Sequence, residues 1–311
     1  MSTVIDLDIN KSEYEESVIA LGNFDGFHIG HRNIVSKAQE IAKEKGVKSS
    51  VLLFKQHTNE VFPHFPQYYI SSLEDKIDIL KEIGVDYIFT IDFTLKFAQL
   101  NNEEFMLDFI RDRLNAKTVV CGPDYTFGKK SKGNVDTILS YKKEGKIDAY
   151  ILDNILYKYN KLSSTQVRAY IENGEVDKVK DLLLYNYKIK GKVIHGFKIG
   201  KELGFPTANI ELIFKYIVPS EGVYLTNTYL NEEKHLSITS IGTNPTVTDK
   251  KDIKIEVYII DFDKKIYDEI ITIEFIKRMR DQIKFDTKEE LIDQMNLDLE
   301  EALKYKNIWI Y

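Results

Sequence analysis

The chain has 311 residues, which suggests two domains at about 150 residues per domain. Apolar residues make up 43% and charged residues 30%, a balance typical of globular rather than disordered protein. Lys and Arg number 43 and Asp and Glu 49, and the resulting net charge of -6 disfavours binding along a nucleic-acid backbone. The single cysteine, Cys121, excludes an intramolecular disulfide and a cysteine metal cluster.

The sequence lacks recognisable targeting or membrane segments. Its first residues, MSTVIDLD, are acidic and contain no apolar run of the kind that signal peptides need. No apolar stretch reaches the roughly 18 residues that a membrane-spanning helix requires. We therefore expect a cytoplasmic protein with no membrane or nucleic-acid partner, and nothing indicates an oligomer.

Strands and helices alternate through the first half of the chain. After a strand at 18–22, a helical pattern runs to about Lys45 and stops at Gly46. Further strands are expected at 50–54, 86–91, 117–121 and 147–152, and further helices at 73–83, 101–114 and 135–143. Asn101 or Asn102 is a suitable N-cap for the third helix. This alternation predicts parallel βαβ units in a doubly wound, Rossmann-like sheet. Two short helices follow, at 165–173 and 176–183.

The pattern changes near residues 184–187. Strand-like runs without intervening helices occupy 188–195, 207–212, 222–230, 236–241, 253–261 and 270–276. This series predicts a small antiparallel β-barrel. A C-terminal amphipathic helix is expected at 287–305, with Leu291, Met295, Leu299 and Leu303 on one stripe. We place the domain boundary between residues 184 and 185, giving domains 1–184 and 185–311.

The segment from Gly22 to His31, GNFDGFHIGH, lies between the first strand and its helix. Glycines allow a sharp turn there, and the N-terminus of the helix favours a phosphate group. His28 and His31 can share one side of the first turn and donate hydrogen bonds as charge builds at an α-phosphorus. No covalent nucleophile is apparent, which indicates direct transfer of AMP. A histidine pair that merely caps the helix is the simpler alternative for the motif alone.

This segment resembles the H-x-G-H signature of nucleotidyltransferases. More closely, it resembles the G-N-F-D-G-V-H-x-G-H of bacterial riboflavin kinase/FAD synthetases, with Phe27 replacing Val. A second string, LSSTQVR at 162–168, resembles the I-S-S-T-x-I-R of that family, although alone it would suit an ordinary capped helix. Besides catalytic His28 and His31, the resemblance implies these ATP-binding residues: Gly22, Asn23, Phe24, Asp25, Gly30, Ser163, Ser164, Thr165 and Arg168.

Two further segments resemble the flavin side of that site. The string GPDYTFG at 122–128 resembles G-x-D-F-x-F-G, which implies that Asp124 and Phe127 bind FMN. The lysines that follow it, at 129, 130 and 132, either approach the FMN phosphate or are solvated. The usual F-D-P-H-P is here FKQHT at 54–58, so Phe54 and His57 match as FMN-binding residues. Both prolines are absent, and we expect a less rigid loop.

The second half contains no G-x-x-x-x-G-K-[ST] loop. Instead, glycines at 191, 196, 200 and 204 allow close approach to a ligand, and Thr207 and Asn209 point to one side of an extended segment. Their oxygens suit Mg²⁺ that bridges phosphates. Alone these glycines would indicate barrel turns, but the segment ending in GFPTAN resembles riboflavin kinases. The resemblance implies Mg-ATP binding by Thr207 and Asn209, and ATP binding by these residues: Gly191, Lys192, Gly196, Gly200, Lys201, Pro206 and Asn244.

Glu256 lies on the polar side of an alternating strand, 254–260. An isolated glutamate there would usually be solvated. The string IEVYIIDF at 255–262 resembles the V-E-x-x-x-x-D-F of the kinase, which implies that Glu256 is the general base for the riboflavin 5′-hydroxyl. The string KRMRD at 277–281 resembles the flavin-side segment, which implies that Arg280 binds riboflavin.

The resemblance therefore implies a bifunctional transferase with Mg²⁺ and ATP as co-substrate. The C-terminal domain converts riboflavin to FMN, and the N-terminal domain converts FMN to FAD and pyrophosphate. Three alternatives stay open: a monofunctional kinase with a weakened adenylyltransferase domain, a non-catalytic flavin-binding regulator, and adenylylation of another acceptor such as a pantetheine phosphate.

Overall fold

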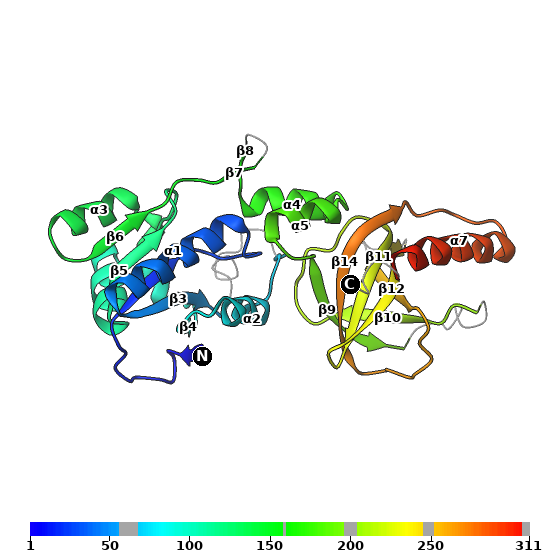
Figure 1. Ribbon diagram of the computed structural model, residues 1–311, viewed down its shortest axis with the longest axis horizontal. Helices are drawn as coiled ribbons and strands as arrows, with labels where there is room; N and C mark the ends of the chain where they lie inside the picture. Colours follow the sequence, from blue (N-terminus) through cyan, green and yellow to red (C-terminus); the bar gives the residue numbers. More distant parts are fainter. Residues whose placement is uncertain (56–67, 158–159, 196–203, 245–251, 307–311) are drawn as a thin grey trace. The chain divides into compact units, whose positions relative to one another are not determined.

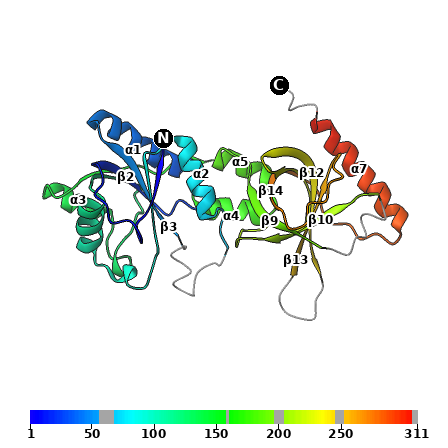
Figure 2. The same ribbon diagram turned by 90° about the horizontal axis from the view of Figure 1, so that it is seen from below.

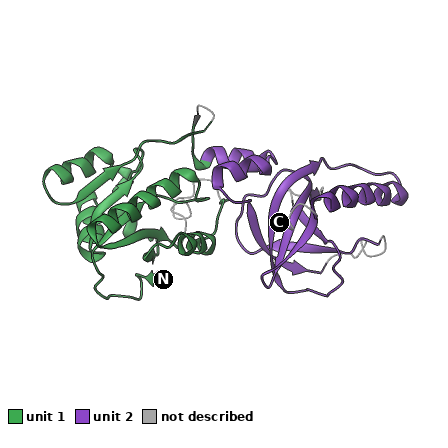
Figure 3. Cartoon of the chain, viewed as in Figure 1, with its two compact units in different colours: residues 1–164 green, residues 165–311 purple. Residues whose placement is uncertain are grey.

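The computed structural model describes residues 1–55, 68–157, 160–195, 204–244 and 252–306. The chain forms two compact units, Met1–Ser164 and Thr165–Tyr311, which Figure 3 colours separately. Within the described residues, no helix is long and apolar enough to cross a membrane.

The first unit is built on a six-stranded, fully parallel sheet with the order β1-β4-β3-β2-β5-β6 (Figure 1). The strands are β1 (Thr3–Asp6), β2 (Ser17–Leu21), β3 (Lys48–Phe54), β4 (Tyr87–Ile91), β5 (Ala116–Cys121) and β6 (Asp148–Ile151). The predicted doubly wound sheet is confirmed. Strand β1, which pairs with β4 from the edge of the sheet, was not predicted.

Helices cover both faces of this sheet. On one face lie α1 (Ile29–Lys45) and α2 (Leu73–Ile83), whose buried residues join one apolar core. On the other face lie η3 (Glu104–Arg113) and α3 (Val135–Lys143). Alternate residues of β2 belong to the two cores, so this central strand is buried on both sides. Such double burial is typical of parallel sheets and explains the continuous apolar run of β2.

Local signals set the helix ends. Gly46 ends α1 in the left-handed conformation at φ 68°, as expected. The side chain of Asn101 accepts hydrogen bonds from the backbone N–H groups of Glu103 and Glu104, which confirms Asn101 as a cap. The helix after this cap is a π-helix over ten residues rather than the α-helix its spacing suggested.

Two short helices open the second unit, α4 (Ser164–Glu172, which starts on the last residue of the first unit) and α5 (Val176–Leu183). A closed antiparallel barrel follows, with the order β10-β13-β12-β11-β14-β9 (Figure 2). Its strands are β9 (Lys188–Ile194), β10 (Thr207–Leu212), β11 (Gly222–Leu230), β12 (Glu233–Asn244), β13 (Asp252–Ile259) and β14 (Ile270–Arg280). The predicted barrel is confirmed.

The C-terminal helix α7 (Lys288–Lys306) packs on the barrel, but the stripe expected on it is partly wrong. Leu303 is exposed, whereas Asp298 and Ala302 are the buried residues. Leu299 does pack against the apolar cluster that contains Ala302. The buried face of α7 therefore differs from the predicted apolar stripe. It includes the polar residue Asp298, because Arg280 of the barrel forms an ion pair with its carboxylate.

Candidate active sites

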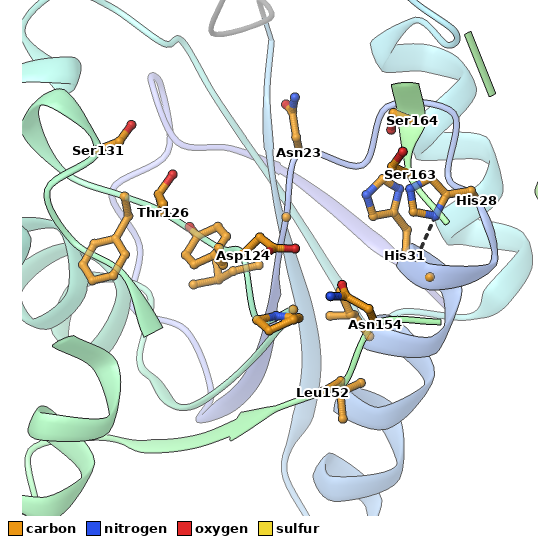
Figure 4. A pocket seen from close by; sticks show the side chains of 18 of the residues that line it. Asn23, His28, His31, Asp124, Thr126, Ser131, Leu152, Asn154, Ser163 and Ser164 are labelled. Carbon is orange, nitrogen blue, oxygen red and sulfur yellow. Dashed lines mark hydrogen bonds between the residues drawn. The ribbon is translucent and has the colours of Figure 1, made fainter. Parts of the chain in front are cut away.

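The first site lies where β2 ends and α1 begins. Because β3 and β5 flank β2 on opposite sides, the strand order reverses here, and such a point favours a ligand crevice at the carboxyl ends of the strands. A cavity of about 570 Å³ opens at this point. Its walls come from the loop after β2 with the start of α1, the end of β3, residues between Phe93 and Phe105, the segment after β5, and residues 152–155 and 161–164 (Figure 4).

His28 and His31 line this cavity as a stacked pair. Their ring centroids are 3.8 Å apart and their planes differ by 16°. His28 is the N-cap of α1, and its Nδ1 accepts a hydrogen bond from the backbone N–H of His31 at 3.4 Å. A neutral His28 therefore carries its proton on Nε2 and can donate from that atom. The capping alternative and the ligand role are thus compatible, because they use different ring nitrogens.

Burial keeps both histidines neutral. Desolvation lowers the pKa of His28 to about 4, against the opposing effect of the nearby Asp25 charge. Desolvation, the neighbouring His28 and the charge of Lys76 together hold the pKa of His31 well below its usual value. The Nδ1 atom of His31 is buried and has no hydrogen-bond partner among the residues that the structure describes. The pair therefore offers neutral hydrogen-bonding groups to a ligand at pH 7.

Asp25 holds the nucleotide loop in place. Its Oδ1 accepts hydrogen bonds from the backbone N–H groups of Ile70 and Ser71, at 3.1 and 3.2 Å. Ser71 Oγ accepts one from the N–H of Gly26, and Ser164 Oγ donates to the carbonyl oxygen of Asp25 at 2.9 Å. Asp25 is 2% exposed, so the structure gives this carboxylate a bracing position. Its predicted contact with ATP stays a prediction.

The other predicted residues of the loop differ in their surroundings. Phe24 is fully buried in the core and stacks with Phe27 at 5.5 Å. A Cβ on Gly22 would meet the Phe24 ring at 3.1 Å, and a Cβ on Gly30 would meet the His28 ring at 3.0 Å. Asn23 is exposed and lines the cavity. Gly30 is therefore a glycine because the His28 ring occupies the space of its side chain.

Aromatic side chains line another part of the cavity. Phe54, at the end of β3, contacts Phe93 at 4.9 Å and Phe97 at 5.6 Å, both edge to face. Phe127 is 5% exposed and packs on Phe105 at 5.5 Å. These rings form an apolar wall of the kind that a flat heteroaromatic ligand requires. His57 lies outside the described residues.

Two residues that line the cavity form an ion pair with each other. Lys161, on the short strand β8 (Asn160–Lys161), contacts the carboxylate of Asp124. Asp124 was predicted to bind FMN, but Lys161 was not singled out, since a lysine just before the LSST string carries no signal by itself. Ser163 and Ser164 also line the cavity, whereas Thr165 and Arg168 lie on α4 within the second unit.

The second site lies on the barrel. In the register of the strands, Glu256 of β13 is directly opposite Asn209 of β10 and Ser240 of β12. Thr207 precedes Asn209 by two residues, so these side chains share one face of the sheet. Glu256 forms an ion pair with Lys254 at 2.8 Å and lines a cavity of about 290 Å³. Thus the residues predicted as general base and magnesium ligands lie side by side.

Several predicted kinase residues have other roles in the structure. A Cβ on Gly191 would lie 2.2 Å from Ile210 Cγ2, so this glycine permits tight strand packing. Lys192 pairs with Asp268 at 2.7 Å, and Pro206 is exposed. Gly196, Gly200 and Lys201 lie outside the described part of the chain. The side chain of Asn244 is also outside it.

Arg280 is engaged by the C-terminal helix. Its Nε and Nη2 donate to the carboxylate of Asp298 at 2.9 and 2.6 Å, and Nη1 donates to the carbonyl oxygen of Asp281. The predicted contact of Arg280 with riboflavin remains a prediction. Gln282 and Glu221, which were not predicted as site residues, line the Glu256 cavity. Gln282 Nε2 donates to Ser240 Oγ and to the carbonyl oxygen of Ile241, both at 2.9 Å.

Comparisons with known proteins agree with this two-site arrangement. The FAD synthetase family profile matches residues 10–166, and the riboflavin kinase profile matches residues 183–306. A bifunctional riboflavin kinase/FMN adenylyltransferase from Listeria monocytogenes is 38% identical over 94% of this chain and 91% of that protein. The protein of that description from Bacillus subtilis is 37% identical over 95% and 94%.

Among solved structures, one described as a macrolide-efflux protein from Streptococcus pneumoniae matches with a TM-score of 0.87 and 30% identity. The match covers 96% of this chain and 98% of that one, so it extends over both units. The two family matches lie in the same order as the sheet unit and the barrel unit, and the curated relatives span nearly the whole chain. The chain belongs to the family of bifunctional riboflavin kinase/FMN adenylyltransferases.

Proposed function

We propose that residues 1–184 transfer AMP from ATP to FMN and that residues 185–311 phosphorylate riboflavin. The observation that carries the first assignment is that a neutral histidine pair and an aromatic wall line one cavity. The facing positions of Glu256 and Asn209 carry the second. The family matches to both units favour one chain with both activities over a kinase alone.

In the first reaction, a phosphate oxygen of FMN attacks the α-phosphorus of ATP. The bond from the α-phosphorus to the bridging oxygen breaks, and pyrophosphate leaves. The N–H of His28 Nε2 donates to the phosphate oxygens as their charge grows. His31 adds a second imidazole on the same side of the helix start, and the N-terminus of α1 adds its dipole. Ser163 and Ser164 supply hydroxyls at the cavity wall.

In the second reaction, the 5′-hydroxyl of riboflavin attacks the γ-phosphorus of ATP, and ADP leaves. Glu256 accepts the hydroxyl proton. Mg²⁺ with bound phosphates needs few protein ligands, and it accepts neutral oxygens. The hydroxyl of Thr207 and the amide oxygen of Asn209 fit this requirement, so they would hold the metal that neutralises the phosphate charge.

A cytoplasmic location stays a prediction.

Flavin chromatography tests the proposal. The chain is incubated with riboflavin, ATP and Mg²⁺, and FMN and FAD are expected in succession. If neither product formed, the assignment of both activities to this chain would be wrong. Formation of FMN without FAD would favour a chain that is a riboflavin kinase alone. With FMN supplied directly, FAD should still form, which separates the two reactions.

Two variants assign the reactions to their sites. His31→Ala should abolish FAD formation and leave FMN formation intact. Glu256→Ala should abolish FMN formation but leave FAD formation from supplied FMN. If each substitution damaged both reactions equally in a folded protein, the two-site assignment would be wrong.

A further inference from the structure

The segment after Phe127 has an unusual backbone at the rim of the first cavity. Lys130 and Ser131 both adopt left-handed conformations, at φ 58° and 53°, although neither is glycine. Consecutive left-handed residues with side chains are unfavourable and tend to occur where function requires them. Both residues line the cavity, whereas their neighbours Lys129 and Lys132 are absent from the described residues that line it.

Backbone contacts hold the residues on either side of Lys130 and Ser131 in place. Phe127 and Gly133 exchange two backbone hydrogen bonds, at 3.0 and 2.9 Å, which close the segment into a loop. The N–H of Lys129 donates to the carbonyl oxygen of Leu100 at 2.7 Å. Gly128 lies against Asn102, where a Cβ would come within 2.5 Å of Oδ1. The loop therefore places Lys130 and Ser131 at the cavity.

The location of Ser131 indicates which part of a ligand this end of the cavity meets. Figure 4 shows Ser131 and Thr126 across the cavity from His28 and His31, with Asp124 between them. Phosphate chemistry belongs to the histidine end. Ser131 lies in the loop that begins at Phe127, a ring of the aromatic wall. A group at this end therefore faces the ring system of the acceptor rather than its phosphate.

We propose that Lys130 and Ser131 bind the polar edge of the flavin ring in the adenylyl-transfer site. The pyrimidine edge of a flavin carries two carbonyl oxygens and one N–H group. An ammonium group only donates, so Lys130 donates to a ring carbonyl, and the hydroxyl of Ser131 accepts from the ring N–H. This assignment rests on the proposed FMN adenylyltransferase function. It explains how the site could distinguish a flavin, which has these polar groups, from an apolar aromatic ring.

Lysine variants test the first contact. In the full-length protein, with FMN, ATP and Mg²⁺, Lys130→Ala should raise the KM for FMN about tenfold, the effect of one lost charge-assisted hydrogen bond. The KM for ATP should stay unchanged. Lys129→Ala and Lys132→Ala are matched controls and should resemble wild type. Equal effects of the three substitutions, or a rise in the KM for ATP in Lys130→Ala, would overturn the proposal.

Lys130→Gly separates binding from folding. Glycine relieves the left-handed backbone, so the melting temperature should not fall, while the KM for FMN should still rise. A purely structural Lys130 predicts the opposite result, with unchanged KM. If wild type itself made no FAD from FMN, the proposed function would fail, whereas active wild type with unaffected Lys130 variants would reject only this inference.

Methylated substrate tests the second contact. FMN methylated at the ring N3 cannot donate to Ser131, so wild type should use it with a KM several-fold higher than that for FMN. In Ser131→Ala, the two substrates should have similar KM values, because the acceptor has gone. A penalty of equal size in Ser131→Ala and wild type would contradict the assignment.

Discussion

The imidazole rings of His28 and His31 stack 3.8 Å apart at the start of α1, and the backbone N–H of His31 donates to Nδ1 of His28. Two charged rings at this separation would repel each other, and burial opposes even one charge. The arrangement therefore supplies two neutral imidazoles beside the phosphate-favouring end of a helix. It also makes the folded state sensitive to acid, because the same rings titrate freely once the chain unfolds.

The first prediction concerns stability against pH. The pKa of His28 is about 4 in the folded protein, against 6.5 for an unperturbed histidine, so between these values the unfolded chain binds more protons. Stability should therefore fall as the pH decreases from about 6.5 to about 4. The loss from this residue should reach roughly 3 kcal/mol. Thermal and urea unfolding of the first unit across this range measures it.

The matched control is His28→Asn. Asparagine is a good N-cap and can still accept from the N–H of His31, but it does not titrate. Its stability should depend less steeply on pH in the same window. A variant with the slope of wild type would show that His28 does not cause the acid sensitivity.

The second prediction concerns Gly30→Ala. Alanine is favoured over glycine within a helix by about 1 kcal/mol, so the fold should tolerate the change. However, the added Cβ would lie 3.0 Å from the His28 ring, which must move. We expect FAD formation to fall at least tenfold while FMN formation and the melting temperature are maintained. Full FAD formation in this variant would mean that the position of the His28 ring is not critical.

The third prediction concerns Lys55, which stands where the family motif has an aspartate. Its Nζ lies 2.7 Å from Asp6, 2.9 Å from Asp8 and 3.9 Å from Asp92, so one lysine joins the ends of neighbouring strands. Lys55→Ala would leave these carboxylates to repel one another. We expect a lower melting temperature, with a deficit that shrinks in 1 M salt. The control is Lys48→Ala, whose 3.9 Å pair with Glu15 is more exposed.

Most elements of the fold were predictable because their signals are local. The bounds of α2, α3 and α5 match the expected ranges, and capping boxes at Ser72 and Asn134 mark the first two. β1 was missed because four residues beside an acidic segment form a strand only through their pairing with β4. A spacing of apolar residues also cannot distinguish a π-helix from an α-helix over the length of η3.

The sites were predictable as motifs but not as contacts. The residues that line the first cavity include most of the predicted ATP and FMN residues of the first unit. Yet the Asp25 carboxylate binds backbone groups 45 and 46 residues away, and no local pattern reports such a contact. Lys161 and Gln282 were missed for a related reason, since their partners come from distant segments.

The last prediction concerns the pair of Arg280 and Asp298. Their side chains are 18% and 8% exposed, and two nitrogens of the guanidinium bind the carboxylate. Asp298→Ala would leave the part-buried guanidinium without its carboxylate, so we expect the second unit to lose about 1–3 kcal/mol in urea unfolding. Replacing both residues, in Arg280→Met with Asp298→Leu, should restore much of that loss, because neither charge is then left alone.

The double variant also tests the predicted contact between Arg280 and riboflavin. Since this variant is expected to fold, its kinetics report on the guanidinium group itself rather than on an unfolded barrel. If Arg280 contacts riboflavin, the KM for riboflavin must rise while the KM for ATP stays near wild type. An unchanged KM for riboflavin would limit Arg280 to holding α7 against β14, which is the role that its hydrogen bonds already describe.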